Sequence, residues 1–76
     1  LSLHDALPIY NRGKIRLALE NIDGALGDLD RAISLKPEHP KAHELFGDAL
    51  MRMGKEEEAA IHWALAERLR EKKKKE

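Results

Sequence analysis

Two histidines, His39 and His43, lie four residues apart, the spacing that places two imidazoles on one face of a helix. Such a pair is typical of a metal site when further ligands complete the set. Pro40 lies between them, however, and proline is favoured in the first turn of a helix. We therefore expect His39 in a turn and His43 in a packed interface. Because the chain has no cysteine and no convincing third ligand, we predict no metal site.

Three consecutive glutamates at positions 56 to 58 are the residues that could supply paired carboxylates for acid–base catalysis. Neighbouring helical residues point about 100° apart. Acidic residues also stabilise the first turn of a helix through its dipole, which explains this cluster without catalysis. The chain has no Ser/His/Asp ordering, Gly-rich phosphate loop or dinucleotide fingerprint. The sequence therefore predicts a protein that is not an enzyme and binds no cofactor.

Four lysines at positions 72 to 75 could contact phosphates. No aromatic residue interleaves them, and 14 basic side chains balance 14 acidic ones over the whole chain, so we expect no nucleic acid partner. We interpret residues 72–76 as a basic, solvated tail. The sequence has no uninterrupted apolar stretch near the length of about 18 residues that a membrane helix needs, and no signal peptide is recognisable. We expect no membrane partner, and the compartment stays open, with the cytoplasm as the default.

Small and apolar residues recur along the chain at an offset of 34 residues. The matching pairs are Gly13 and Gly47, Leu17 and Met51, Ala25 and Ala59, Leu29 and Trp63, Ala32 and Ala66, and Leu35 and Leu69. A fixed period in the range of about 20 to 50 residues indicates a repeat architecture. Because the shared positions are small or apolar, the recurring feature is packing rather than chemistry.

Helical periodicity predicts the elements that position these residues. The predicted helices cover residues 10–19, 23–35 and 40–53, and a fourth helix follows Lys55. Pro40 suits the first turn of the third helix, and Gly54 suits a left-handed cap at its end. The joints between helices are short, so we expect consecutive helices to pack antiparallel.

The repeated pattern resembles the tetratricopeptide repeat, a helix-turn-helix unit of 34 residues, over about residues 10–69. With position 1 at Ala6 and at Pro40, both units have small residues at positions 8, 20 and 27 and a large residue at position 24. Pro37 occupies position 32, and Glu20 departs from the family at position 15, where glycine is usual. The resemblance implies an all-α fold in which two antiparallel helix-turn-helix repeats stack as a short right-handed α-solenoid.

The first nine residues interrupt this pattern. Their sequence resembles a translated sequencing-adapter read-through, so we interpret residues 1–9 as a non-native leader and expect its deletion to leave the helicity per residue essentially unaltered. Residues 10–39 then form a first repeat that is truncated at its N-terminus. Residues 40–71 form the second repeat, and residues 72–76 form the tail. We infer that the chain is a fragment of a longer protein.

The resemblance also implies a surface, because these repeats line a concave groove with the exposed side of their first helices. The implied partner-binding residues are Tyr10, Lys14, Leu17, Lys41, Glu44, Asp48, Met51 and Arg52. The competing interpretation is an ordinary solvated helix face. Repeats that clamp the C-terminal carboxylate of chaperones use Lys and Asn at places that Tyr10, Lys14 and Leu45 occupy here, which argues against that sub-class.

The mixed basic, acidic and thioether lining suits an extended or helical peptide that carries both charges and an apolar anchor. We therefore expect a non-enzymatic protein–protein interaction module, a scaffold or adaptor, that binds a segment of a protein partner in this groove. Two alternatives stay open. The exposed apolar ends of the stack could pair with a second copy of the chain to form a homo-oligomer. The chain could also be an accessory repeat region of a larger enzyme or regulatory protein.

Overall fold

Four α-helices make up the part of the chain that the structure describes. The computed structural model describes the backbone of residues 3–74 and the side chains of residues 4–73. A short 3-10 helix, Leu3–Asp5, leads into α1 (Ala6–Ala18), α2 (Ile22–Leu35), α3 (Pro40–Arg52) and α4 (Glu56–Lys74). No strand occurs within these residues, so the all-α class predicted from the sequence is confirmed. Among the same residues, no helix combines the length and the apolar character needed to cross a membrane.

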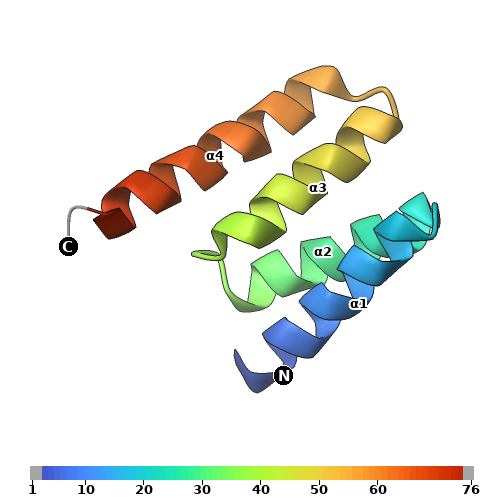
Figure 1. Ribbon diagram of the computed structural model, residues 1–76, viewed down its shortest axis with the longest axis horizontal. Coiled ribbons are helices and arrows are strands. Elements are labelled where there is room, and N and C mark those ends of the chain that lie inside the picture. Colours follow the sequence, from blue (N-terminus) through green and yellow to red (C-terminus); the bar gives the residue numbers. More distant parts are fainter. Residues whose placement is uncertain (1–2, 75–76) are drawn as a thin grey trace.

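The helices pack as two pairs. α1 lies along α2 and α3 lies along α4, with α2 against α3 as the joint between the pairs, while α1 touches α3 at few points. Consecutive helices run in opposite directions, and α4 lies on the side of α3 away from α1 and α2 (Figure 1). The result is a slab of 36 × 29 × 17 Å.

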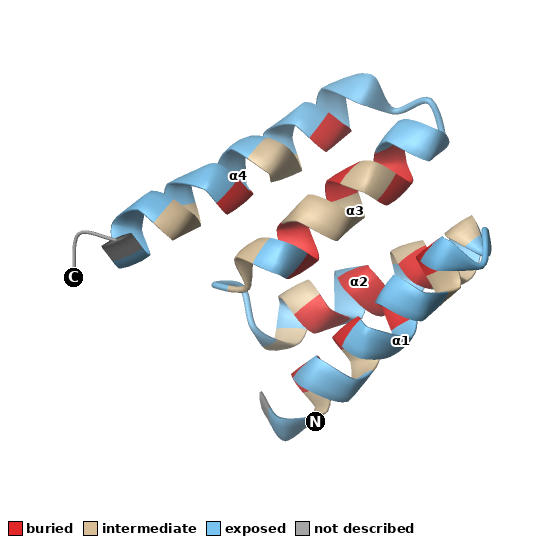
Figure 2. Ribbon diagram, viewed as in Figure 1, coloured by how far each residue is buried: buried red, intermediate tan, exposed pale blue. Residues whose placement is uncertain are grey.

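Small residues occupy the places where the helices cross. Ala25, Ala32 and Ala59 are completely buried, and the buried residues lie along the facing sides of the helices (Figure 2). A Cβ atom on Gly13 would lie 3.0 Å from the Cβ of Asp28, and one on Gly47 would lie 2.5 Å from Nε1 of Trp63. The facing helix therefore leaves no room for a side chain at Gly13 or Gly47, the two glycines of the 34-residue pattern.

The remaining members of that pattern are the larger residues. Leu29 is completely buried, and its counterpart Trp63 is half-buried. Leu17 is 5% exposed, whereas its counterpart Met51 is 37% exposed. The two helix pairs thus share their crossings but differ at the exposed side of their first helices.

The helix ends follow from local chemistry. Pro40 opens α3, where a missing backbone N–H costs nothing, and the Nδ1 atom of His39 accepts a hydrogen bond from the Ala42 N–H at 3.2 Å. Gly54 follows α3 with a φ of 80°, which confirms the predicted left-handed cap. Glu20 occupies the corresponding place after α1 and has a φ of 65°. A residue with a Cβ atom is strained in this conformation.

The beginning of α1 differs from the prediction. The helix starts at Ala6 rather than at residue 10; Ala6 is 2% exposed, and Ile9 packs against the core. These two residues extend the apolar side of the helix that continues through Tyr10 and Leu17. Residues 6–9 therefore belong to the folded unit, whereas residues 1–2 of the predicted leader and residues 75–76 of the predicted tail lie outside the described residues.

Candidate binding surface

A shallow hollow of about 160 Å³ lies between α1 and α3. Its lining consists of Tyr10, Lys14, Lys41, Glu44 and Leu45. All but Leu45 belong to the predicted partner-binding set, and they come from both helix pairs. The hollow forms here because α1 and α3 make few contacts with each other.

Charge around this hollow is unevenly compensated. Lys14 and Lys41 are exposed, and within the described part of the chain neither forms an ion pair. Glu44, in contrast, pairs with Arg70 of α4. The positive charges are therefore the ones left available to a ligand.

Tyr10 forms the floor of the hollow. It is 6% exposed, and its ring lies against that of His39 with the centroids 4.6 Å apart. Burial, and secondarily the charge of Glu44, raises the pKa of the Tyr10 phenol. Tyr10 thus presents a neutral, mostly apolar surface with a small accessible area.

A second hollow of about 260 Å³ adjoins the first through Glu44 and continues between α3 and α4. The indole Nε1–H of Trp63 points into this region and lies 3.1 Å from Oδ1 of Asp48 and 3.2 Å from the carbonyl oxygen of Glu44. Asp48 is thus already engaged by α4. The predicted partner-binding set did not include Trp63 or Arg70, although the fourth helix was predicted antiparallel to the third, an arrangement that brings such side chains together.

The other predicted residues lie elsewhere. Leu17 is buried in the core, so its side chain offers little surface to a partner. The guanidinium of Arg52 donates to Oε1 of Glu20 at 3.0 Å and to the carbonyl oxygen of Leu17 at 3.3 Å, and so ties the ends of α1 and α3 together. Met51 is exposed on α3. The structure therefore gathers Tyr10, Lys14, Lys41 and Glu44, places Asp48 beside them, and separates Leu17 and Arg52 from them.

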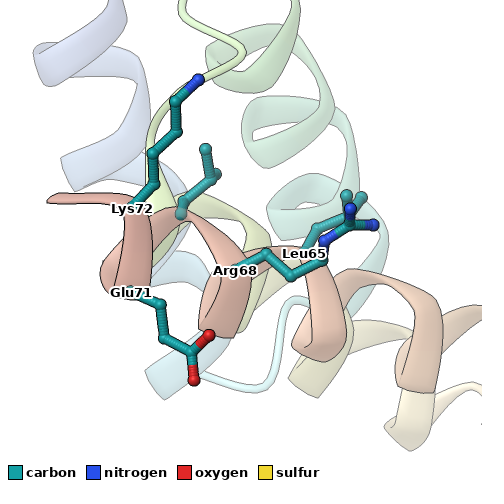
Figure 3. Close-up of a pocket in the computed structure, with 5 residues that line it drawn as sticks. Leu65, Arg68, Glu71 and Lys72 are labelled. Atoms are coloured by element: carbon teal, nitrogen blue, oxygen red, sulfur yellow. The ribbon is translucent and has the colours of Figure 1, made fainter. Parts of the chain in front are cut away.

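Another hollow, of about 560 Å³, lies on α4 (Figure 3). Its lining consists of Leu65, Arg68, Leu69, Glu71 and Lys72. In Figure 3 the charged ends of Arg68, Glu71 and Lys72 point in different directions, so they do not converge on one ligand. This surface is an open face of one helix rather than a binding pocket.

The histidines considered as metal ligands are separated by the fold. His39 lies in extended backbone before α3 and caps that helix, whereas His43 is buried and faces His62 of α4. Burial, followed by the charge of Lys36, lowers the pKa of His39. Within the described residues, no three His, Cys, Asp or Glu side chains are grouped so that they could hold a metal ion.

Comparison of the chain with protein-family models, with curated proteins and with solved structures finds no match. The function is therefore inferred from the fold and from the surface between α1 and α3.

Proposed function

We propose that this chain is a non-enzymatic protein-interaction module whose two helix pairs are tetratricopeptide-type repeats, stacked as a short right-handed solenoid. The tight approaches at Gly13 and Gly47 support this proposal, because at both places an added Cβ would lie within 3.1 Å of atoms of the facing helix and the two places are one repeat length apart. Glu20 and Gly54, whose backbones are both left-handed, are separated by the same 34 residues, so the turn inside each helix pair is also repeated.

The partner segment binds across α1 and α3, at the hollow that Lys14 and Lys41 flank. The observation that carries this proposal is that each helix pair contributes one cation without an ion pair, whereas the nearby Glu44 already forms an ion pair with Arg70. Between the cations, Tyr10 and Leu45 provide an apolar floor. Such a surface fits a peptide in which an acidic side chain stands next to an apolar one.

Selection of binders from a random peptide library, followed by calorimetric titration, tests this function. We expect the selected peptides to be enriched in Asp or Glu beside an apolar residue. The double variant Lys14→Glu with Lys41→Glu should weaken their binding about tenfold, because two attractions become repulsions.

Lys55→Glu is the matched control, since Lys55 is also exposed but lies in the turn between α3 and α4. This variant should bind as the original chain does. Selected peptides that are basic, or an affinity that survives the double charge reversal, would exclude the hollow as the binding site.

Self-association is the second candidate function, and a stripe of exposed apolar residues along α1 and at its C-terminal cap favours it. Leu7 and Ile15 of α1 are 59% and 58% exposed, and Leu19, the residue after α1, is 74% exposed. Their spacing places them within about 120° of one another around the helix axis. A second copy could cover this stripe. Sedimentation at several concentrations separates the two candidates: a dilute monomer that binds peptide supports the hollow, and a tight dimer supports assembly.

A further inference from the structure

Two imidazole rings meet end to end between α3 and α4. The Nδ1 atoms of His43 and His62 are 3.1 Å apart, and His43 is only 6% exposed. The ring centroids are 5.3 Å apart, 2.2 Å more than the Nδ1–Nδ1 distance (5.3 less 3.1), and the ring planes differ by 19°. That excess is close to the diameter of one imidazole ring, so both nitrogens lie on the line that joins the ring centres. The contact is therefore an in-plane N–H···N hydrogen bond rather than a stack of ring faces.

The neighbouring hydrogen bond fixes which ring donates. Nε2 of His43 lies 2.9 Å from the carbonyl oxygen of Pro37, and because a carbonyl only accepts, this nitrogen carries the proton. The Nδ1 atom of neutral His43 then has a lone pair, so His62 donates from its own Nδ1. Among the described residues no buried side-chain nitrogen lacks a partner, so water reaches the unbonded Nε2 of His62.

The pair can hold one extra proton without losing its bond, but not two. The first proton enters at Nε2 of His62 and makes the bond to His43 charge-assisted. A second proton has to enter at Nδ1 of His43, which puts an N–H group on both facing nitrogens and a second positive charge in a buried place. The hydrogen bond between α3 and α4 is then lost.

Charged groups of α4, of α2 and of the connection between α2 and α3 act on the pair. Burial, followed by the charge of His43, lowers the pKa of His62, while Glu58 of the same helix and Asp30 of α2 act in the opposite direction. On the side of His43, the charge of that ring disfavours charging of His39 in the connection between α2 and α3, where Lys36 acts in the same direction. Both His62 and His39 therefore resist a further proton.

We propose that His43 and His62 form an acid-sensitive latch, which stabilises the packing of α4 on α3 with at most one proton bound and destabilises it when both rings are charged. The latch spans three segments, because His62 bonds His43 and His43 bonds the connection at Pro37. Its loss also disturbs the neighbouring Trp63, whose indole bonds Asp48. Acid therefore loosens α4 and the acidic lining of α3 together.

The direction of the pH effect follows from proton counting. In the unfolded chain both histidines bind protons near their ordinary pKa of about 6.5. Because the bond between the rings accommodates only one extra proton, the unfolded chain below that pH binds up to one proton more than the folded pair, and the stabilisation present above this value is lost as the pH falls. The unfolding equilibrium constant then rises by up to about tenfold per pH unit.

The tautomers provide the first test, on the 15N-labelled chain as it is. Long-range 1H–15N NMR spectra at pH about 8 should show the proton of His62 on Nδ1 and that of His43 on Nε2. On acidification His62 should charge first, and the second protonation should coincide with loss of the native α3 and α4 signals. Overturning outcomes are a His62 proton on Nε2 at neutral pH, or two histidines that titrate independently.

Urea unfolding measured by circular dichroism from pH about 8 to 5 provides the second test, with His62→Asn as the variant. The side-chain NH2 of Asn can donate to neutral His43, and after a flip of the amide its carbonyl oxygen can accept from charged His43. The amide itself does not titrate. We expect this variant to lose most of the acid-induced rise in the unfolding constant. His4→Asn, at an exposed histidine outside the pair, should keep the full rise. Equal pH dependence of the two variants would refute the latch.

Discussion

Backbone strain is concentrated at Glu20, the one described residue other than glycine with a positive φ. The left-handed conformation costs a residue with a Cβ atom about 1 to 2 kcal/mol. The carboxylate of Glu20 also accepts a hydrogen bond from Arg52, but an exposed ion pair contributes only about 0 to 1 kcal/mol. The strain therefore outweighs the ion pair. Gly54 occupies the same place in the second pair without this cost.

We predict that Glu20→Gly is more stable than Glu20→Ala by about 1 kcal/mol, and at least as stable as the original chain. Both variants lose the ion pair to Arg52, but only the glycine variant relieves the strain. Urea unfolding monitored by circular dichroism measures the difference. Two variants of equal stability would show that the left-handed backbone at this position is not costly.

A buried carboxylate illustrates the opposite balance at the same scale. Asp28 of α2 accepts from Arg12 at 2.9 and 2.8 Å and from Arg16 at 3.1 Å. The hydrogen bond from Arg12 is the main reason why the pKa of Asp28 is lowered. The charge is therefore retained in a nearly buried place because two guanidinium groups of α1 satisfy it.

At the scale of the element, the first turn of α1 contributes to the core with only one of its sides. Its sequence resembles a leader, yet Ile9 packs against the core in the structure while Leu7, two residues earlier, is 59% exposed. Within one helical turn the segment thus has a side that contributes to the fold and a side that does not.

Substitutions in this turn test whether the segment stabilises the fold. We expect Ile9→Ala to lower the free energy of unfolding by about 1 to 2 kcal/mol, less than for a fully buried isoleucine. Leu7→Ala, the matched control, should change it by less than about 0.5 kcal/mol. Chemical denaturation of both variants makes the comparison. If neither variant differs from the original chain, the segment lies outside the folded unit, as the sequence alone indicated.

At the scale of the whole molecule, stability depends on a few closely packed helix crossings. A chain of 76 residues buries only about 60 to 65% of the surface that its unfolded form exposes, so its margin is small. In the second pair, α3 and α4 approach so closely at Gly47 that an added Cβ would lie 3.1 Å from the carbonyl oxygen of Ala59. A larger residue at this crossing has no room.

We predict that Ala59→Leu lowers the stability of the whole molecule by about 1 to 3 kcal/mol or more, enough to unfold much of it at room temperature. Ala60→Leu adds the same side chain at the next, exposed position of α4 and should leave the melting curve unchanged. Thermal melting followed by circular dichroism distinguishes the two. A normal melting curve for Ala59→Leu would contradict the packing of α3 on α4.

The crossings could be predicted from the sequence because packing residues repeat at a fixed spacing along the chain. Gly13, Gly47 and Ala59 are examples, and Pro40 and Gly54 act locally on the backbone, so their roles were also predictable. Leu17 was predicted on the binding surface because of its position in the family pattern, but in the structure its side chain is buried in the core.

The contacts between distant side chains could not be predicted in the same way. The pairing of Glu44 with Arg70 and of His43 with His62 depends on the offset between α3 and α4, which the turn around Gly54 and the close contact at Gly47 set together. A shift of one helical turn would separate both pairs. The start of α1 differs from the prediction for another reason: residues 1–9 resemble a non-native leader, yet Ala6 and Ile9 continue the apolar side of the helix.

The bond between Trp63 and Asp48 has a practical consequence. The chain contains one tryptophan and one tyrosine, and the fold places Trp63 in α4 and Tyr10 in α1. Each helix pair thus carries its own intrinsic fluorophore. Indole emission follows the detachment of α4 from α3, and phenol absorbance follows the solvation of α1. A dye-free optical experiment on the unaltered chain can therefore reveal whether the two halves separate in sequence or in a single step.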